Sequence, residues 1–224
     1  MRVRWYGLFT RLTLRDVAAQ LRDVPYKDGS ADGFVVEQLR SDVLEASLIQ
    51  RLQTTHEAID PFGFKEQFEV IEYVRTQFRL NSTRNVIELR DPGRSSSKLV
   101  SRLLEVLGAN FTIEEETVNP LVWANKFREM VDLYGSIERV QIGSVALREN
   151  TVAQVVVRGS SDVADAAIKF VAPSEYTLEK VQLKLRSARG SVTFQRNSSV
   201  VLSAGFDERL MDALRDSLRE TRTK

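Results

Sequence analysis

The residues whose type and spacing point most clearly to chemistry are cations placed two positions apart. From Lys180 onward polar residues alternate with apolar ones: Lys180, Gln182, Lys184 and Arg186 against Val181, Leu183 and Leu185. In a β-strand this alternation puts the polar set on one face, about 6.6 Å apart, and turns the apolar set into the core. A row of cations with an amide at that spacing could follow the phosphates of a nucleic-acid backbone.

A second row of the same design occurs earlier, where Tyr73, Arg75, Gln77 and Arg79 alternate with Val74, Thr76 and Phe78. Further cations surround the two rows, and the candidate nucleic-acid-binding set is Arg75, Arg79, Arg84, Arg94, Lys98, Arg102, Lys180, Lys184, Arg186, Arg189 and Arg196. Tyr73 could stack on a base. The competing interpretation is an ordinary solvated face of an antiparallel sheet, which is polar in any case.

The loop DPGRSSSK, residues 91–98, is a second candidate anion site. Gly93 permits an unusual turn, and the serines precede a predicted helix, whose free N–H groups favour anions. Arg94 and Lys98 would add charge. The loop is not a P-loop, because the second glycine and the Gly-Lys pair are missing, and a simple helix cap explains the same residues.

Most catalytic machinery is excluded by residue types. The chain has no cysteine and one histidine, His56, so thiolate zinc sites, paired-histidine sites and cysteine nucleophiles are ruled out. No G-x-S-x-G or G-x-G-x-x-G motif occurs, and no lysine follows an acid at the D/E-x-K spacing of metal-dependent nucleases. A carboxylate group could gather round Mg²⁺, but no spacing demands it: Glu57, Asp60, Glu66 and Glu69. We therefore expect no active site, no cofactor and no metal.

Charge is balanced overall and segregated locally. The 224 residues carry a net charge of +1, so no global field draws the chain to nucleic acid. Residues 36–72 are acidic and residues 73–102 basic, and one copy's acidic face could therefore meet another copy's basic face. No apolar stretch is long enough for a signal peptide or a membrane span. We expect a cytoplasmic protein without membrane contact.

The hydrophobic pattern predicts an α+β fold, with mostly antiparallel sheets and four to five helices packed on one side. Predicted strands cover residues 2–10, 34–59 with a break near 41–42, 73–80, 85–89, 111–118, 137–147, 151–158, 176–186, 192–195 and 200–203; predicted helices begin near residues 13, 96, 119, 161 and 206. Residues 64–80 fit either a helix or a strand, and alternation from Tyr73 favours a strand. A division into an N-terminal part, 1–118, and a C-terminal part, 119–224, is compatible with a single domain.

Together these features predict a non-enzymatic nucleic-acid-binding accessory protein, acting on DNA in preference to RNA. No family motif is matched. The order of elements is similar to that of small accessory proteins of phages and bacterial mobile elements, and a phage-related or antiviral role is expected from that similarity alone. The first alternative is a protein-interaction or homo-oligomeric scaffold subunit that binds no nucleic acid. A metal-dependent phosphodiesterase built from carboxylates comes third.

Overall fold

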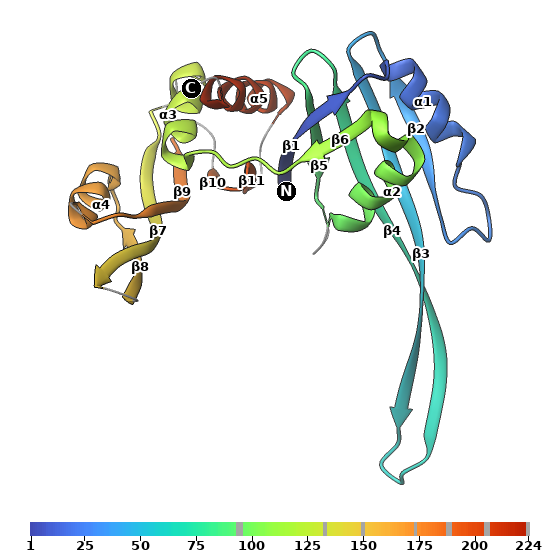
Figure 1. Cartoon of the computed structure of the whole chain (residues 1–224). Helices are drawn as coiled ribbons and strands as arrows, with labels where there is room; N and C mark the ends of the chain where they lie inside the picture. The colour runs from blue at the N-terminus through green and yellow to red at the C-terminus, as the bar shows by residue number, and fades with distance from the viewer. Residues whose placement is uncertain are drawn as a thin grey trace. The chain divides into compact units, whose positions relative to one another are not determined.

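The computed structural model describes residues 1–92, 96–131, 134–148, 151–172, 174–186, 190–203 and 207–222. In this part of the chain eleven strands form a large antiparallel sheet accompanied by five α-helices, which confirms the α+β class (Figure 1). The chain divides into two compact units. We call Gly7–Glu114 the hairpin unit, and Met1–Tyr6 with Glu115–Lys224 the terminal unit. Strand β1, Arg2–Thr10, contributes to both.

The hairpin unit orders its strands β2-β3-β4-β5-β1, and β6 pairs with the second half of β1. Its elements are α1 (Leu14–Asp23), β2 (Asp32–Leu39), β3 (Val43–Ile59), β4 (Lys65–Asn81), β5 (Val86–Arg90), α2 (Ser97–Leu107), the 3-10 turn η1 (Gly108–Asn110) and β6 (Phe111–Glu114). Helix α1 begins as its sequence predicts: Thr13 and Asp16 form a reciprocal capping box. Its buried face, which includes Val17 and Leu21, packs toward β2.

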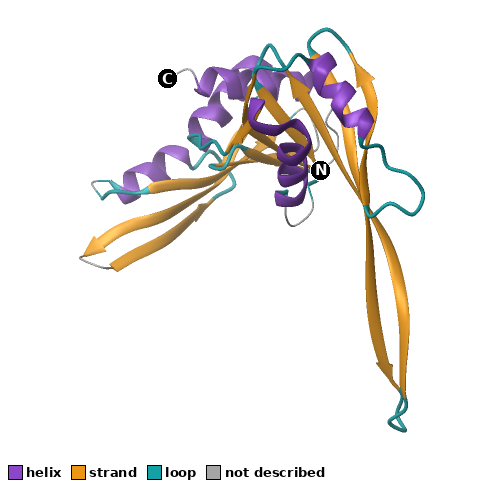
Figure 2. Cartoon of the chain, turned by 45° about the vertical axis from the view of Figure 1, so that its right-hand side comes forward, coloured by secondary structure: helices purple, strands orange, loops and turns teal. Residues whose placement is uncertain are grey.

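Strands β3 and β4 are unusually long and extend far beyond the rest of the hairpin unit (Figures 1 and 2). Each has 17 residues, and they pair without a register shift from Val43↔Asn81 to Ile59↔Lys65. Side chains in the body of the unit, such as Leu44 and Leu80, are fully buried. Every residue from 53 to 69 is exposed. We call residues 52–72 the arm.

The terminal unit orders its strands β1-β11-β10-β9-β7-β8. Its elements are α3 (Pro120–Val131), β7 (Ser136–Arg148), β8 (Thr151–Arg158), α4 (Ala164–Val171), β9 (Thr177–Leu185), β10 (Gly190–Gln195), β11 (Ser199–Leu202) and α5 (Glu208–Arg222). Helix α3 packs against β9, β10 and α5, and α4 packs against β7. One face of this sheet is therefore covered by α3.

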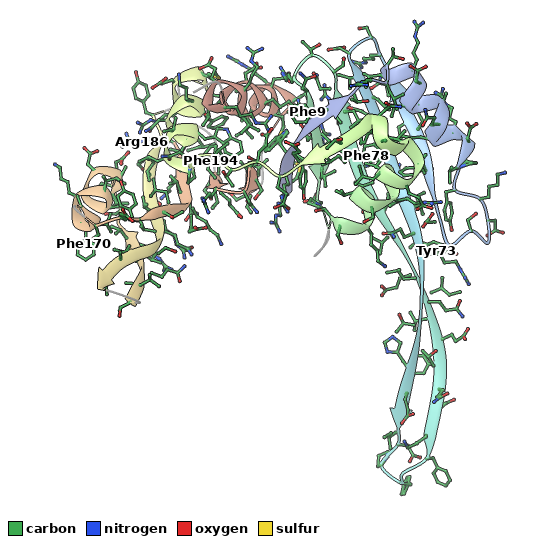
Figure 3. The ribbon with its side chains drawn as sticks, in the orientation of Figure 1. Phe9, Tyr73, Phe78, Phe170, Arg186 and Phe194 are labelled. Atoms are coloured by element: carbon green, nitrogen blue, oxygen red, sulfur yellow. The ribbon has the colours of Figure 1, made fainter. Side chains whose placement is uncertain are left out.

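An aromatic cluster holds α3 to the sheet of the terminal unit. The ring of Trp123 meets Trp5 of β1 edge to face at 5.7 Å and Phe194 of β10 at 5.1 Å. Phe194, labelled in Figure 3, also lies 5.7 Å from Phe127. All four rings are almost fully buried. Val3 and Trp5 are thus core residues, and Arg2 and Arg4, which alternate with them, lie on the opposite face of the sheet.

Several expectations for individual elements need correction. The ambiguous segment 64–80 is a strand, and it starts at Lys65 rather than at Tyr73, because β3 pairs with it over its whole length. The strand expected over 111–118 ends at Glu114. Glu115 leaves the strand and pairs with Arg4, while Glu116 pairs with Arg222. Ion pairs with distant segments therefore replace strand pairing at this point.

Candidate nucleic-acid interface

The face of the terminal unit's sheet opposite α3 carries a row of mostly polar side chains across six strands. Residues in direct register across neighbouring strands share one face. From β8 to β1 the first row is Arg158, Arg139, Gln182, Thr193, Val201 and Arg2. Their neighbours along the strands, such as Val140, Val181 and Phe194, are fully buried on the other face. The row spans five strand spacings, about 24 Å.

Two further rows extend this surface. The second runs Val156, Gln141, Lys180, Gln195, Ser199 and Arg4 from β8 to β1, and Ser199 in it is fully buried. The third places Lys184 between Ser136 and Ser191. We call this surface the basic face, after its six cations: Arg2, Arg4, Arg139, Arg158, Lys180 and Lys184. The same strands also carry the carboxylates of Glu138 and Glu179. Because six cations outnumber these two carboxylates, positive charge predominates.

Some cations of the basic face are already neutralised. The Lys184 ammonium lies 3.0 Å from the carboxylate of Glu138. The guanidinium of Arg4 lies 2.9 Å from Glu115 and 4.5 Å from the centre of the Tyr6 ring. Within the described residues no carboxylate pairs with Arg139, Arg158 or Lys180. These three cations carry the uncompensated charge of the face.

Arg139 and Arg158 stand directly opposite each other on β7 and β8. Two like charges in register on neighbouring strands destabilise a sheet. Because they are in register, their side chains lie on the same face of the sheet. Arg158 is exposed and Arg139 half-buried. An anion bound between them would turn this repulsion into two attractions.

A pocket of about 750 Å³ lies where β9 ends, beside the basic face. It is lined by Gln182, Lys184, Arg186 and the serines 136, 160, 191 and 203, with Glu138 as its one acid. Arg186, labelled in Figure 3, is exposed here and also lines a neighbouring pocket of about 480 Å³. The hydroxyls of Ser191 and Ser203 lie 3.5 Å apart. Hydroxyls and two cations around one cavity suit a phosphate group.

The predicted row on β4 lies in the hairpin unit, whereas the β9 row lies in the terminal unit. Arg75 lies 2.8 Å from Glu37 and also donates to Ser47, while Arg79 lies 3.7 Å from Glu45. The hydroxyl of Ser47, more than the neighbouring Arg75, lowers the pKa of Glu37. These arginines therefore already have carboxylate partners on the sheet surface. Tyr73 meets Tyr26 edge to face at 6.5 Å, at the base of the arm (Figure 3).

The remaining predicted cations are dispersed. Arg84 lies in the turn between β4 and β5, where its backbone N–H donates to Asn81. Arg102 of α2 lies 3.0 Å from Asp32 and 2.7 Å from Glu105. Lys98 is exposed on the first turn of α2, and Arg196 is exposed in the turn between β10 and β11. Arg94 and Arg189 lie outside the described residues.

The loop 91–98 is described only in part, because residues 93–95 fall outside the described residues. Helix α2 begins at Ser97, close to the predicted start. Ser96 is its N-cap residue, and its side chain makes no capping hydrogen bond. The anion site expected in this loop remains a prediction.

Four cations of the basic face were not among the predicted residues: Arg2, Arg4, Arg139 and Arg158. Arg2 and Arg4 alternate with Val3 and Trp5, so the periodicity that identified Lys180 and Lys184 was available for them. Alternation around Arg139 is interrupted, because register shifts occur between Ile137 and Arg139. Arg158 is a single cation at the end of a strand, and only its pairing with β7 brings it onto the surface.

The predicted carboxylate group lies on or beside the arm, together with His56. Glu57 forms an ion pair with Lys65 at 2.8 Å, and Glu69 accepts a hydrogen bond from Gln53. His56 stacks on Phe68 with ring centres 5.6 Å apart. Over the described residues no group of three or more metal-binding side chains comes together.

Comparison with known proteins gives no family assignment: no family model matches the chain, and no curated protein matches it. In the described part of the chain no helix has the length and apolarity needed to cross a membrane.

Proposed function

We propose that this protein binds the sugar–phosphate backbone of nucleic acid, with DNA as its partner, through the basic face of the terminal unit. It acts as a binding protein and performs no catalysis. The observation that carries this proposal is the opposed pair Arg139 and Arg158, together with the neighbouring Lys180. Two arginines in register do not stabilise the folded sheet, because like charges opposite each other repel. A phosphate bound between them relieves this repulsion.

We expect the basic face to contact the phosphates of the nucleic acid rather than its bases. Tyr6 lies on this face, only 3% exposed, and the guanidinium of Arg4 covers its ring. Stacking of bases on exposed rings is therefore not supported here. Cations and amides contact phosphates without reading sequence, so we expect binding that is independent of sequence and steeply dependent on salt.

The test is a salt series of fluorescence anisotropy with labelled single- and double-stranded DNA. The triple variant Arg139→Ala, Arg158→Ala and Lys180→Ala should weaken binding to all sequences alike. It should also reduce the slope of log K against log salt by about 2 to 3, because each cation removed abolishes one phosphate contact. Unchanged affinity in this variant would contradict the proposal.

A matched control removes the same charge from the hairpin unit. Arg15, Arg22 and Lys27 are exposed, lie on or just after α1, and make no ion pair within the described residues. Their triple alanine variant lowers the net charge by the same amount. Because these three residues lie outside the basic face, the variant should weaken DNA binding much less than the Arg139, Arg158 and Lys180 variant does. Equal losses in the two variants would show a diffuse effect of net charge and would remove the basic face as the site.

A further inference from the structure

The arm exposes large apolar side chains that nothing in the described chain covers. Phe62 is 87% exposed, Phe64 74% and Ile59 61%, all near the turn at its tip. Phe68, half exposed, stacks on His56 a few residues further back. An exposed apolar cluster of this kind marks an interaction site.

The apolar side of the arm continues the buried face of its sheet. Along β4, Phe68 and Val70 alternate in phase with Phe78 and Leu80. Phe78 and Leu80 are almost completely buried in the hairpin unit, whereas Phe68 is exposed. The face that is covered in the body of the unit is thus uncovered in the arm.

The charge of the arm restricts what can cover it. Residues 52–72 contain five carboxylates (Glu57, Asp60, Glu66, Glu69, Glu72) and a single lysine, Lys65. Two arms laid together would repel each other, and so would an arm and a phosphate backbone. The occupant must be a basic surface that also offers apolar contacts.

We propose that the arm of one copy docks on the basic face of a second copy of this chain. The basic face supplies the required charge through Arg139, Arg158 and Lys180, and apolar contact through Val156 and Val201, which are 41% and 39% exposed. The dimensions also agree. Eight residues of β3 in the arm extend about 27 Å, and the six strands of the basic face span about 24 Å.

Such a contact joins two different surfaces, so every copy keeps one free arm and one free face. Association of this kind produces rings or open chains. The inference rests on the basic face of the proposed function, because the arm and nucleic acid would use the same cations. Nucleic acid should therefore dissociate the assembly.

Sedimentation velocity of the full chain, without nucleic acid, tests the contact. At about 50 mM salt species heavier than the single chain should form with rising concentration, and at about 500 mM salt, where charges are screened, they should dissociate. Two charge-reversal variants, one in the arm and one in the basic face, should each abolish the heavy species. The arm variant is Glu66→Lys with Glu72→Lys; the face variant is Arg158→Glu with Lys180→Glu.

The decisive variant carries both reversals in one chain, because it restores opposite charges across the contact. Recovery of the heavy species in this fourfold variant supports the proposal, as does their loss in Phe62→Ser with Phe64→Ser. All substituted side chains are exposed, and circular dichroism checks that each variant folds.

A wild-type chain that stays monomeric at low salt overturns the proposal and leaves another protein as the occupant. Association lost in the arm variant but kept in the face variant would mean arm-to-arm contact and would also overturn it.

Addition of single-stranded DNA separates this inference from the proposed function. Dissociation of the assembly by DNA supports both. If DNA does not bind while the reversals still control association, the proposed function fails and the docking contact stands. If DNA binds and the chain never associates, the docking contact fails and the proposed function stands.

Discussion

The guanidinium of Arg75 lies 2.8 Å from the carboxylate of Glu37, and both groups also hydrogen-bond the hydroxyl of the buried Ser47. Arg75 thus belongs to a three-residue network on the surface of the hairpin unit. We expect Arg75→Ala to leave DNA affinity unchanged and to lower the free energy of unfolding by no more than about 1 kcal/mol, the usual range for a partly exposed ion pair. Anisotropy and urea unfolding measure the two effects. A loss of affinity as large as that of Arg139→Ala would return the β4 row to the binding site.

The same network predicts a dependence of stability on pH. The Ser47 hydroxyl and Arg75 hold the pKa of Glu37 below its ordinary value of 4.5. A carboxyl whose folded pKa is depressed contributes stability above its unfolded pKa and loses that contribution as the pH falls through the folded value. The wild type should therefore unfold at higher urea than Glu37→Gln at pH 7, and the two should converge as the pH falls through the lowered pKa of Glu37. A difference that stays constant between these pH values would assign the effect of the substitution to packing.

The opposed arginines predict a conflict between stability and binding. Arg158→Glu places opposite charges in register with Arg139, which should stabilise the free protein by about 0.2–1 kcal/mol in thermal unfolding. The same change should weaken DNA binding by more than Arg158→Gln does, because it adds a repulsive charge to the site. Arg158→Gln serves as the control that removes the repulsion alone. A variant that is destabilised would show that Arg158 has a carboxylate partner or a packing role.

Lys184 and Lys180 should contribute unequally, although they repeat on the same strand. Lys184 is paired with Glu138 at 3.0 Å, and Lys180 has no ion pair among the described residues. We expect Lys180→Ala to weaken DNA binding more than Lys184→Ala, and Glu138→Gln to strengthen it. Anisotropy at one low salt concentration compares all three. Equal losses for the two lysines would indicate that the Glu138 pair opens when nucleic acid binds.

The contact between Trp5 and Trp123 joins the first strand to a helix more than a hundred residues later. Trp123 also donates its indole N–H to the hydroxyl of Ser217 at 3.0 Å. Trp123→Ala should therefore cost about 3–5 kcal/mol in urea unfolding, the usual range for a large buried ring. Removing residues 55–69 and joining Thr54 to Val70 through Asn-Gly keeps the strand register and should cost little, since every deleted side chain is exposed. A large loss from the second change would make the arm part of the folding core.

Local periodicity was sufficient for much of the fold. Alternation along residues 180–185 predicted both a strand and its exposed face, because side-chain direction in a strand depends only on position along the chain. Thr13 and Asp16 likewise identified a helix start through a capping box, which needs only neighbouring residues. The lysines of the basic face were found for the same reason.

Tertiary structure alone decided which charges act together. The sequence shows Arg75 and Lys180 as equivalent members of polar rows, but partners far along the chain, such as Glu37, neutralise the first and not the second. Arg139 and Arg158 are 19 positions apart, and strand pairing sets them face to face. The exposure of Phe68 also depends on tertiary structure. Phe68 lies on the face of β4 that is buried at Phe78 and Leu80, and in the arm no other described element packs against that face. Burial and charge compensation arise from contacts between distant segments, which the order of residues does not specify.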